Sequence, residues 1–550
     1  MARRRTASRL RPWVQGASLG LFCALALCAG TRLGAVLPPD LLLRLDPLAG
    51  VLTPVAARQW LPSLTPALAV LALALVGGRV FCGWLCPTGA LFTLCGHGLR
   101  RILRGASPAA RPWFGAVPCA LLAALLAAAL CGVNLSHWAS PLPLLERLLA
   151  LVLLPLGLAV ADSAASALAP LWEGINATAV LYWHAPPRAF ATAGLVATLW
   201  LTLVALEGLY PRCWCRYLCP AGALLGLVGR WAVWRRRAVR PHTCTQCGCC
   251  AAACPAGIAR DAAPVPVVTC LACHACQDAC PHGVLRFGPS TASPAPISTG
   301  RRAFVGRALL GGALLGLGAA AVVRADPVRV SAAPPSFPPE TAVLRPPGAL
   351  PEVDFLSRCL RCGACMQACP TGGLQPLWFA AGLDGLFSPC LEPRAGGCLP
   401  ECAACGAACP SHAIRPLTLA QKRWAKLGTA LVDEKTCLAW KDDKRCMVCK
   451  ENCPYGAVDV VLREGHKVPV PIVHARRCYG CGFCEHHCPK APTAIRVRAD
   501  GALRPAGGDI QAAARAAGLE LDPRVHQQAT TGDSQNFSPQ DTGPPPGFLP

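Results

Sequence analysis

Cysteine spacing constrains this chain more than any other feature of its sequence. The chain has 550 residues, of which 36 are cysteines. Twenty-four of these cysteines form six tight quartets, and a proline follows the last cysteine of each quartet. Four quartets have the spacing C-x₂-C-x₂-C-x₃-C-P, and the other two have a longer first gap. The quartets are Cys244, Cys247, Cys250 and Cys254; Cys270, Cys273, Cys276 and Cys280; Cys359, Cys362, Cys365 and Cys369; Cys398, Cys402, Cys405 and Cys409; Cys437, Cys446, Cys449 and Cys453; and Cys478, Cys481, Cys484 and Cys488.

Thiolate sulfur is a ligand for both iron–sulfur clusters and zinc, so the spacing of the cysteines must show which of the two is bound. Structural zinc sites pair two short cysteine knuckles across a long gap, whereas these quartets are dense and each ends in Cys-Pro. Three thiolates separated by two residues wrap one cluster within a single loop. The fourth thiolate, beside the proline, reaches the partner cluster of a two-cluster module. The sequence therefore predicts six [4Fe-4S] clusters, held by the 24 quartet cysteines.

The segment CLACHACQDACP, residues 270–281, also contains C-x-x-C-H, the signature of c-type haem attachment. The same quartet pattern recurs where no histidine follows the second cysteine, and the chain has no other C-x-x-C-H. We therefore expect His274 to be a surface residue of a cluster loop, and we expect no haem.

Apolar runs indicate membrane-spanning helices. The chain is 53% hydrophobic and 15% charged, whereas about 25% of residues are charged in an ordinary soluble domain. A spanning helix needs about 20 apolar residues. A further apolar run between Arg147 and Asp162 has 14 uncharged residues, which predicts an interfacial or re-entrant segment. The four spanning helices are expected near residues 13–31, 60–78, 113–133 and 190–210.

The basic residues favour a membrane over a nucleic acid. The net charge is +23, and arginines flank the apolar runs at residues 3–11, 100–111 and 230–240. Cytoplasmic loops carry such an excess, whereas a nucleic-acid interface gathers its basic residues into one patch or stripe. All three groups of arginines lie in the cytoplasm only if the chain crosses the membrane an even number of times between residues 111 and 230. The apolar runs at 113–133 and 190–210 already supply two crossings. We therefore place residues 134–189 outside the membrane and residues 241–300 in the cytoplasm.

A second membrane signal lies in mid-chain. Arg301 and Arg302 precede 16 uncharged residues that begin at Ala308. Paired arginines before an apolar helix are typical of a twin-arginine export signal; an ordinary anchor flanked by arginines is the alternative. Sixteen residues reach about 24 Å, short of a hydrocarbon core of about 30 Å. We therefore expect the helix to begin before Arg307, whose side chain would snorkel to the interface. The Cys-rich region that follows is expected to be periplasmic.

Two apolar runs end in the same motif, C-x₃-C-P-x-G-A-L, which occurs in FCGWLCPTGAL and CWCRYLCPAGALLG. Four soft ligands from two equivalent hairpins could hold a metal or act as a redox pair. The alternative is a structural helix cap built on Pro-x-Gly. Eight other cysteines fit no pattern and are expected to be small buried hydrophobic residues. The four motif cysteines are Cys82, Cys86, Cys215 and Cys219.

The expected fold class is an α-helical membrane domain combined with α+β ferredoxin-like modules. The predicted divisions are a membrane domain at 1–240, a two-cluster ferredoxin domain at 241–288, a linker at 289–300, a signal or anchor helix at 301–324, a Pro-rich linker at 325–352, a four-cluster ferredoxin domain at 353–499 and a disordered tail at 500–550.

Two parts of the chain resemble known families. The segments GGRVFCGWLCPTGA and RCWCRYLCPAGALLG, followed by two ferredoxin motifs, resemble the NapH/MauN type of membrane ferredoxin and the related NosR membrane core. Residues 345–496 resemble the NapG/MauM type, a periplasmic four-cluster ferredoxin exported by the twin-arginine route. RPPGALPE, CPTGGLQP and the block from Cys437 to Cys453 carry that second resemblance. The chain departs from both families because it joins the two parts and places the export signal between them.

The resemblance implies a multi-pass polyferredoxin of the bacterial inner membrane. It would oxidise quinol or relay electrons between the quinone pool and a periplasmic partner, such as a cytochrome or a reductase. A bound quinone is a second carrier to consider beside the clusters. No catalytic triad, carboxylate pair beside a histidine or phosphate-binding loop is recognised. An iron–sulfur assembly or regulatory factor for a periplasmic enzyme is the alternative, and whether the chain is itself a quinol dehydrogenase subunit stays open.

Overall fold

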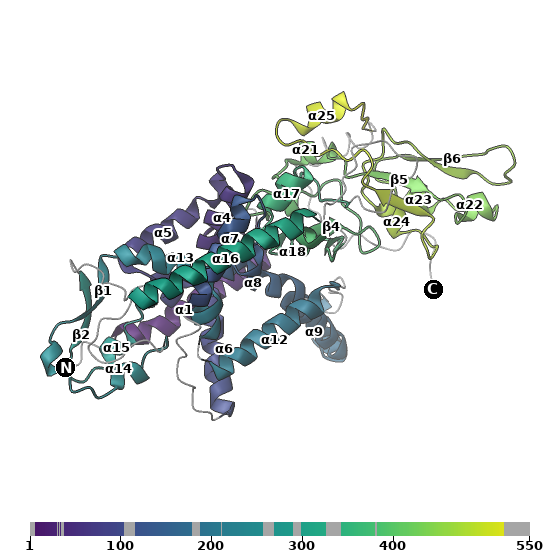
Figure 1. The fold of residues 1–550 in the computed structure, drawn as a ribbon. Coiled ribbons are helices and arrows are strands. Elements are labelled where there is room, and N and C mark those ends of the chain that lie inside the picture. Colours follow the sequence, from purple (N-terminus) through teal and green to yellow (C-terminus); the bar gives the residue numbers. More distant parts are fainter. Residues whose placement is uncertain are drawn as a thin grey trace.

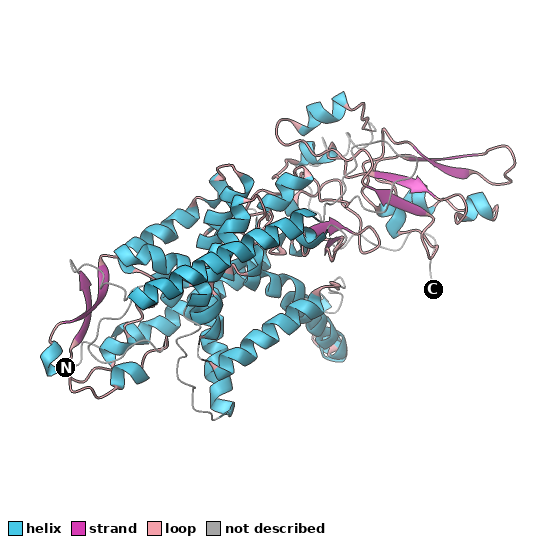
Figure 2. Ribbon diagram, viewed as in Figure 1, coloured by secondary structure: helices cyan, strands magenta, loops and turns pink. Residues whose placement is uncertain are grey.

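A helical region lies between two Cys-rich units (Figure 1). The computed structural model describes residues 6–29, 31, 34, 38–103, 116–178, 188–210, 212–256, 269–289, 299–325, 343–379 and 382–521. The first unit, residues 232–289, lies at one end of the helical region, and the second unit, residues 343–521, lies at the other. The described strands belong to these two units (Figure 2).

Leucine and alanine dominate the helical region, and both favour helix. Several helices begin at proline, which loses no intrahelical hydrogen bond at the first position. The helices are α1 (Thr6–Cys28), α3 (Leu41–Arg44), α4 (Pro47–Ala57), α5 (Pro66–Gly77), α6 (Pro87–Leu103), α7 (Val117–Leu130), α8 (Pro141–Leu148), α9 (Leu154–Ala167), α10 (Ala169–Gly174), α12 (Ala193–Leu209), α13 (Pro220–Val228) and α16 (Thr299–Ala325), with π-helical turns η3 (Phe81–Leu85), η6 (Leu149–Leu153) and η7 (Trp214–Leu218).

Three described helical stretches are long and apolar enough to cross a membrane: Arg9–Cys28, Pro141–Ala167 and Val305–Val323. The first agrees with the helix expected near residues 13–31. The segments expected to span the membrane near 60–78, 113–133 and 190–210 are apolar helices of 10–17 residues, and so is α4. The apolar part of α16 begins at Val305 and therefore includes Arg307, as the sequence predicted.

The interval expected to be a short interfacial segment is part of a longer helix. α8, η6 and α9 run without a break from Pro141 to Ala167, a stretch of 27 residues. The apolar run begins after Arg147 in the sequence, but Glu146 and Arg147 are only 4% and 1% exposed. Because these charges are buried inside the protein, they do not end the helix. The placement of residues 134–189 outside the membrane depended on that short length and loses its support.

α16 packs lengthwise against α7 and runs from the first Cys-rich unit to the second (Figure 1). Gly312 and Gly316 form a G-x-x-x-G spacing on the contact face. A Cβ at Gly312 would lie 2.2 Å from the carbonyl oxygen of Ala120, and one at Gly316 would lie 2.0 Å from that of Ala124. Small residues at this spacing let two helix backbones approach closely.

The Cys-rich units consist of short helices and two-stranded antiparallel sheets. The first unit has β1 (Trp234–Ala238) paired with β2 (Leu285–Pro289), α14 (Cys249–Ala252) and α15 (Ala275–Asp278). In the second unit, β3 (Leu374–Pro376) pairs with β4 (Pro389–Leu391), β5 (Thr429–Val432) with β8 (Ile495–Arg498), and β6 (Val458–Val461) with β7 (Val470–Val473). Its helices are α17 (Glu352–Arg358), α18 (Ala364–Gln367), α19 (Gly382–Gly385), α20 (Ala404–Ala407), α21 (Leu419–Arg423), α22 (Leu438–Lys441), α23 (Val448–Glu451), α24 (Phe483–His486) and α25 (Ile510–Ala516).

The second unit is longer at both ends than the sequence predicted. Residues 343–352 were assigned to a linker, but Arg345 is 1% exposed and donates hydrogen bonds to Glu352 and Ser388. Residues 500–521 were assigned to a disordered tail, but they include α25, whose Ile510 is 1% exposed. These segments have no periodic pattern in the sequence. Their order comes from contacts with distant parts of the chain, which the sequence does not show. Residues 326–342 and 522–550 lie outside the described residues.

Candidate functional site

Three pairs of short helices lie at the centre of the quartets. α14 packs against α15, α18 against α20, and α23 against α24, and each of the six helices carries the third cysteine of one quartet. Several of these helices follow a residue with positive φ, such as Gly363 at +91° and Gly482 at +88°. Glycine adopts this conformation at little cost, so the tight turn before the helix is built into the sequence.

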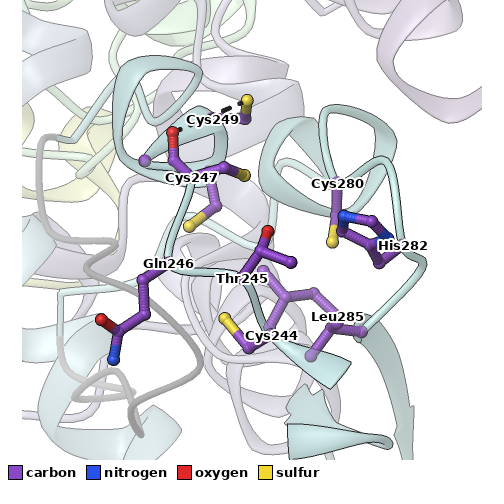
Figure 3. Close-up of a pocket in the computed structure, with 11 residues that line it drawn as sticks. Cys244, Thr245, Gln246, Cys247, Cys249, Cys280, His282 and Leu285 are labelled. Carbon is purple, nitrogen blue, oxygen red and sulfur yellow. Dashed lines mark hydrogen bonds between the residues drawn. The ribbon is translucent and has the colours of Figure 1, made fainter. Parts of the chain in front are cut away.

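The two quartets of the first pair exchange their fourth cysteines. Cys244, Cys247 and Cys250 line one cavity together with Cys280, which comes from the other quartet (Figure 3). Burial raises the pKa of Cys270 to about 11, and negative charge on Cys273 and Cys254 contributes to the rise. Cys254 therefore lies beside the quartet to which it does not belong in sequence.

The same exchange occurs in the other two pairs. Cys488 lines the cavity of Cys437, Cys446 and Cys449, and Cys453 lines the cavity of Cys478, Cys481 and Cys484. In the α18–α20 pair, burial raises the pKa of Cys365, and so does negative charge on Cys362, Cys359 and Cys409. Burial likewise raises the pKa of Cys405, as does negative charge on Cys398, Cys402 and Cys369. The structure thus groups the quartet cysteines into six sets of three plus one.

These sets fit an iron–sulfur cluster by donor chemistry. The three quartet cavities have no carboxylate in their linings. Backbone N–H groups point at sulfur: Ala430 donates to Cys478 Sγ at 3.3 Å, and Ala457 donates to Cys453 Sγ at 3.3 Å. In the described part of the chain, no three His, Cys, Asp or Glu side chains are arranged to hold one metal ion. A four-iron cluster needs no such arrangement, because each cysteine binds a different iron.

Lys422 places a positive charge between two sets. Its side chain is fully buried, and its charge acts on the thiol of Cys398. Burial acts to lower the pKa of Lys422, but negative charge on Cys398, Tyr455 and Cys405 outweighs burial and raises it. The ammonium group therefore stays charged in the interior of the second unit.

The loop from Cys359 to Cys369 is attached to the helical region by polar contacts. Arg361 donates to the carbonyl oxygen of Asn134 at 2.8 Å, and Arg147 donates to the carbonyl oxygen of Arg361 at 2.9 Å. Burial lowers the pKa of His137 well below its ordinary value, as do the neighbouring Arg361 and Arg147, so the imidazole between them is neutral.

The α18–α20 pair also contacts the α23–α24 pair. The N–H of Cys398 donates to the carbonyl oxygen of Cys481 at 2.7 Å. A Cβ at Gly397 would lie 2.7 Å from the ring of Phe483, so only glycine allows this approach. The sets in the second unit therefore form a continuous array that begins at the helical region.

The two C-x₃-C-P motifs meet in one cavity, although 133 residues separate their first cysteines. Each motif begins in a π-helical turn, η3 or η7, and such turns are frequent at functional sites. Arg79 also lines the cavity, and it is 6% exposed. We call the four cysteines of this cavity the loop cysteines: Cys82, Cys86, Cys215 and Cys219.

The loop between Cys82 and Cys86 touches the first Cys-rich unit. A Cβ at Gly83 would lie 2.2 Å from the carbonyl oxygen of Leu271, and Trp84 Nε1 donates to the carbonyl oxygen of Ala272 at 3.1 Å. His274 was predicted at the surface, but its ring is half-buried and lies 4.2 Å from that of Phe287. Trp84 of the helical region also lies edge-on to this ring, with the two ring centroids 6.2 Å apart.

Sequence reasoning missed Arg79, although a signal for it exists. In both motifs an arginine stands three residues before the first cysteine: Arg79 and Arg212, which are 6% and 3% exposed.

The eight cysteines outside any pattern were expected to be buried. Cys213 is buried, Cys249 is exposed and the other six are half-buried.

Quartets that exchange their fourth cysteine define a ferredoxin-type iron–sulfur electron-transfer protein. The chain is 36% identical over 198 residues to the methylamine utilization ferredoxin-type protein MauM of Paracoccus denitrificans, which is 35% of this chain and 81% of that protein. It is 35% identical over 162 residues to the ferredoxin-type protein NapG of Escherichia coli, 28% of this chain and 69% of that protein. The chain belongs to this MauM/NapG family.

Other comparisons extend to the helical region. The chain is 31% identical over 210 residues to the methylamine utilization ferredoxin-type protein MauN of Paracoccus denitrificans, 37% of this chain and 56% of that protein. A 4Fe-4S binding domain model matches residues 59–105 and 192–241, and a 4Fe-4S dicluster domain model matches residues 269–373. The dicluster match joins two quartets that the structure places in different units. No solved structure matches the chain.

Proposed function

We propose that this chain is a membrane-anchored relay that carries electrons between the quinone pool and a redox partner across the membrane. One observation carries the proposal: the two Cys-rich units lie at opposite ends of a helical region (Figure 1). Three helical stretches between the two units are long and apolar enough to cross a bilayer. α16 has 27 residues, about 40 Å at 1.5 Å per residue, which exceeds a hydrocarbon core of about 30 Å.

The six cysteine sets would hold six [4Fe-4S] clusters, which supply one-electron carriers when bound. The residues around them determine the order of the sets. The loop containing Cys270 faces the helical region at one end, and the loop containing Cys359 faces it at the other. From there the array continues through Cys398 to Cys481. This order is what a relay from one side of the membrane to the other requires.

The proposed orientation rests on the arginines at residues 230–240, next to the first unit, and on the paired Arg301 and Arg302. The first unit would be cytoplasmic, and the second would be periplasmic, exported with Arg301 and Arg302 as its twin-arginine signal. The membrane would be the bacterial inner membrane, and the partner would be a periplasmic cytochrome or reductase. Similarity to the ferredoxin-type proteins MauM and NapG supports an electron-transfer role. The identity of the redox partner is proposed here together with that role.

Quinol-driven reduction tests this function. Anaerobic membranes that contain the full chain would be mixed with a quinol analogue, and the clusters would be followed by EPR. We expect signals of reduced clusters in both units, with dithionite as the control for full reduction. If dithionite reduces the clusters and quinol does not, the relay from quinol is wrong. A partner enzyme that lacks its own cofactor in a deletion strain would then favour the assembly or regulatory alternative.

A further inference from the structure

The loop cysteines form a ligand set that the six quartets do not use. All four line one cavity and are 6–9% exposed. That cavity has no carboxylate or histidine in its lining. Soft thiolate ligands alone select iron–sulfur clusters, zinc or copper(I) over harder cations. The question is which of these the surroundings favour.

Each motif supplies a matching sulfur acceptor at the start of a helix. Gly89 N–H donates to Cys86 Sγ at 3.5 Å, and Gly222 N–H donates to Cys219 Sγ at 3.4 Å. These cysteines directly precede α6, which has 17 residues, and α13, which has nine. Both helix N-termini therefore favour negative charge on sulfur.

Arg79 provides a buried positive charge for the same site. It lines the same cavity as the thiols of Cys82, Cys219 and Cys215, and its Nη2 donates to the carbonyl oxygen of Cys215 at 3.0 Å. Its Nε is buried without a hydrogen-bond partner. A Cβ at Gly222 would lie 2.1 Å from Arg79 Nη2, so the glycine makes room for the arginine. A buried guanidinium needs an anion, and a thiolate-bound cluster is one.

The cavity of the loop cysteines resembles the three quartet cavities. Its volume is about 10 Å³, and the quartet cavities have volumes of about 10–30 Å³. As in those cavities, the loop cysteines are not arranged to hold one metal ion among the residues that the structure describes. The 4Fe-4S binding domain model matches the two segments that carry the loop cysteines and contains no quartet cysteine.

We propose that the loop cysteines bind a seventh iron–sulfur cluster, which joins the two cluster arrays. Its place between them rests on the relay proposed above. On one side, Gly83 and Trp84 touch the loop between Cys270 and Cys273. On the other side, Thr88 Oγ1 donates to the carbonyl oxygen of Pro141 at 2.8 Å, at the start of α8. The same helix carries Arg147, which bonds the loop between Cys359 and Cys362.

In this site one electron at a time would pass from a reduced donor cluster to the oxidised seventh cluster, and then to an oxidised acceptor cluster. No bond is made or broken, and no proton is required. The loop cysteines hold the site, while Arg79 stabilises its negative charge.

Metal content tests the site independently of electron flow. The full chain would be purified anaerobically in detergent, and iron, acid-labile sulfide, zinc and copper would be measured per chain. We expect about 28 irons, four for each of seven clusters. In Cys86→Ala, and in a variant with all four loop cysteines replaced by alanine, we expect the same loss of about four irons. Cys213→Ser is the matched control, since Cys213 is buried two residues from Cys215 but does not line the cavity.

About 24 irons in the wild-type chain, with unchanged iron in both variants, would overturn the proposal. The count for the wild-type chain does not depend on whether a variant folds. Loss of one zinc or copper in place of four irons would also overturn it, in favour of a single-ion site. The relay stands or falls separately. If quinol still reduces the clusters of both units in Cys86→Ala and the iron content is unchanged, the seventh cluster is wrong and the relay stands. If the iron content is as expected and quinol reduces nothing, the site stands and the relay is wrong.

Discussion

At the scale of single residues, the most informative positions are the fourth cysteines of the quartets. Cys280 follows Cys276 in sequence but lies with Cys244, Cys247 and Cys250 in space. This exchange ties two quartets into one unit, because neither set of four is complete without the other loop. The position of a single thiol therefore determines which cysteines act together.

Paired substitutions test the exchange. If Cys244 and Cys280 hold the same cluster, the double variant Cys244→Ala/Cys280→Ala should lose about four irons, no more than either single variant. The double variant Cys244→Ala/Cys254→Ala should lose about eight, because with the exchange these two cysteines hold different clusters. Iron per chain is the measurement. The reverse pattern would restore the grouping by sequence order.

Lys422 offers an electrostatic prediction. Replacing Lys422 with Met removes a buried positive charge beside Cys398, so reduction of the neighbouring cluster becomes harder. A unit charge at about 6 Å in an effective dielectric of about 20 contributes about 3 kcal/mol, which corresponds to a fall in potential on the order of 100 mV. EPR-monitored redox titration measures it. Lys422→Arg, which keeps the charge, should stay close to wild type; an equal fall in both variants would point to a packing defect.

At the scale of elements, the contact between α16 and α7 joins a mid-chain helix to the N-terminal part of the chain. Gly312 and Gly316 face α7, whereas Gly311 and Gly318 have no atom within 4 Å of the position of a Cβ. The four glycines lie within eight residues of one another, so they provide matched positions on two faces of one helix.

Gly316→Val should separate α16 from α7 and destabilise the chain by about 1–3 kcal/mol, the usual range for overpacking. Thermal unfolding of the detergent-solubilised protein is the measurement. Gly318→Val places the same side chain on the other face and should change the midpoint little. Equal effects of the two substitutions would show that valine is unfavourable in this helix regardless of its face.

At the scale of the whole molecule, one hydrophobic core extends from the helical region into the second Cys-rich unit. One buried polar cluster lies at this junction: Arg361, Arg147 and His137 interact with one another and with Asn134. His137 has no exposed surface, and its pKa is depressed chiefly by burial and further by the two arginines. The junction therefore depends on a neutral histidine between two cations.

This arrangement predicts acid sensitivity. The unfolded chain binds a proton at His137 once the pH falls below about 6.5, whereas the folded chain does not, because the folded pKa is lower. Stability should therefore be unaffected by His137 above that pH and should fall by up to about 1.4 kcal/mol per pH unit below it. Unfolding midpoints on either side of that pH, from about 7.5 to about 5.5, measure the slope. His137→Gln should have a flatter slope; an identical slope would assign the effect to other groups.

The sequence by itself determined the candidate ligands and the cofactor class. Cluster loops are local, since three cysteines and a following Cys-Pro fit in about a dozen residues, and their spacing is visible without a fold. Apolar runs likewise predicted the positions of most long helices. The MauM/NapG resemblance, read from short motifs, is confirmed by the comparisons.

Only the tertiary structure decided which residues act together. The exchange of fourth cysteines, the meeting of Cys82 with Cys215 and the burial of Arg79 all depend on contacts between distant segments. Glu146 and Arg147 interrupt an apolar run in the sequence, yet both are buried inside a continuous helix. Local sequence encodes periodicity and spacing, but burial of a charge and convergence of loops are set by what packs against them.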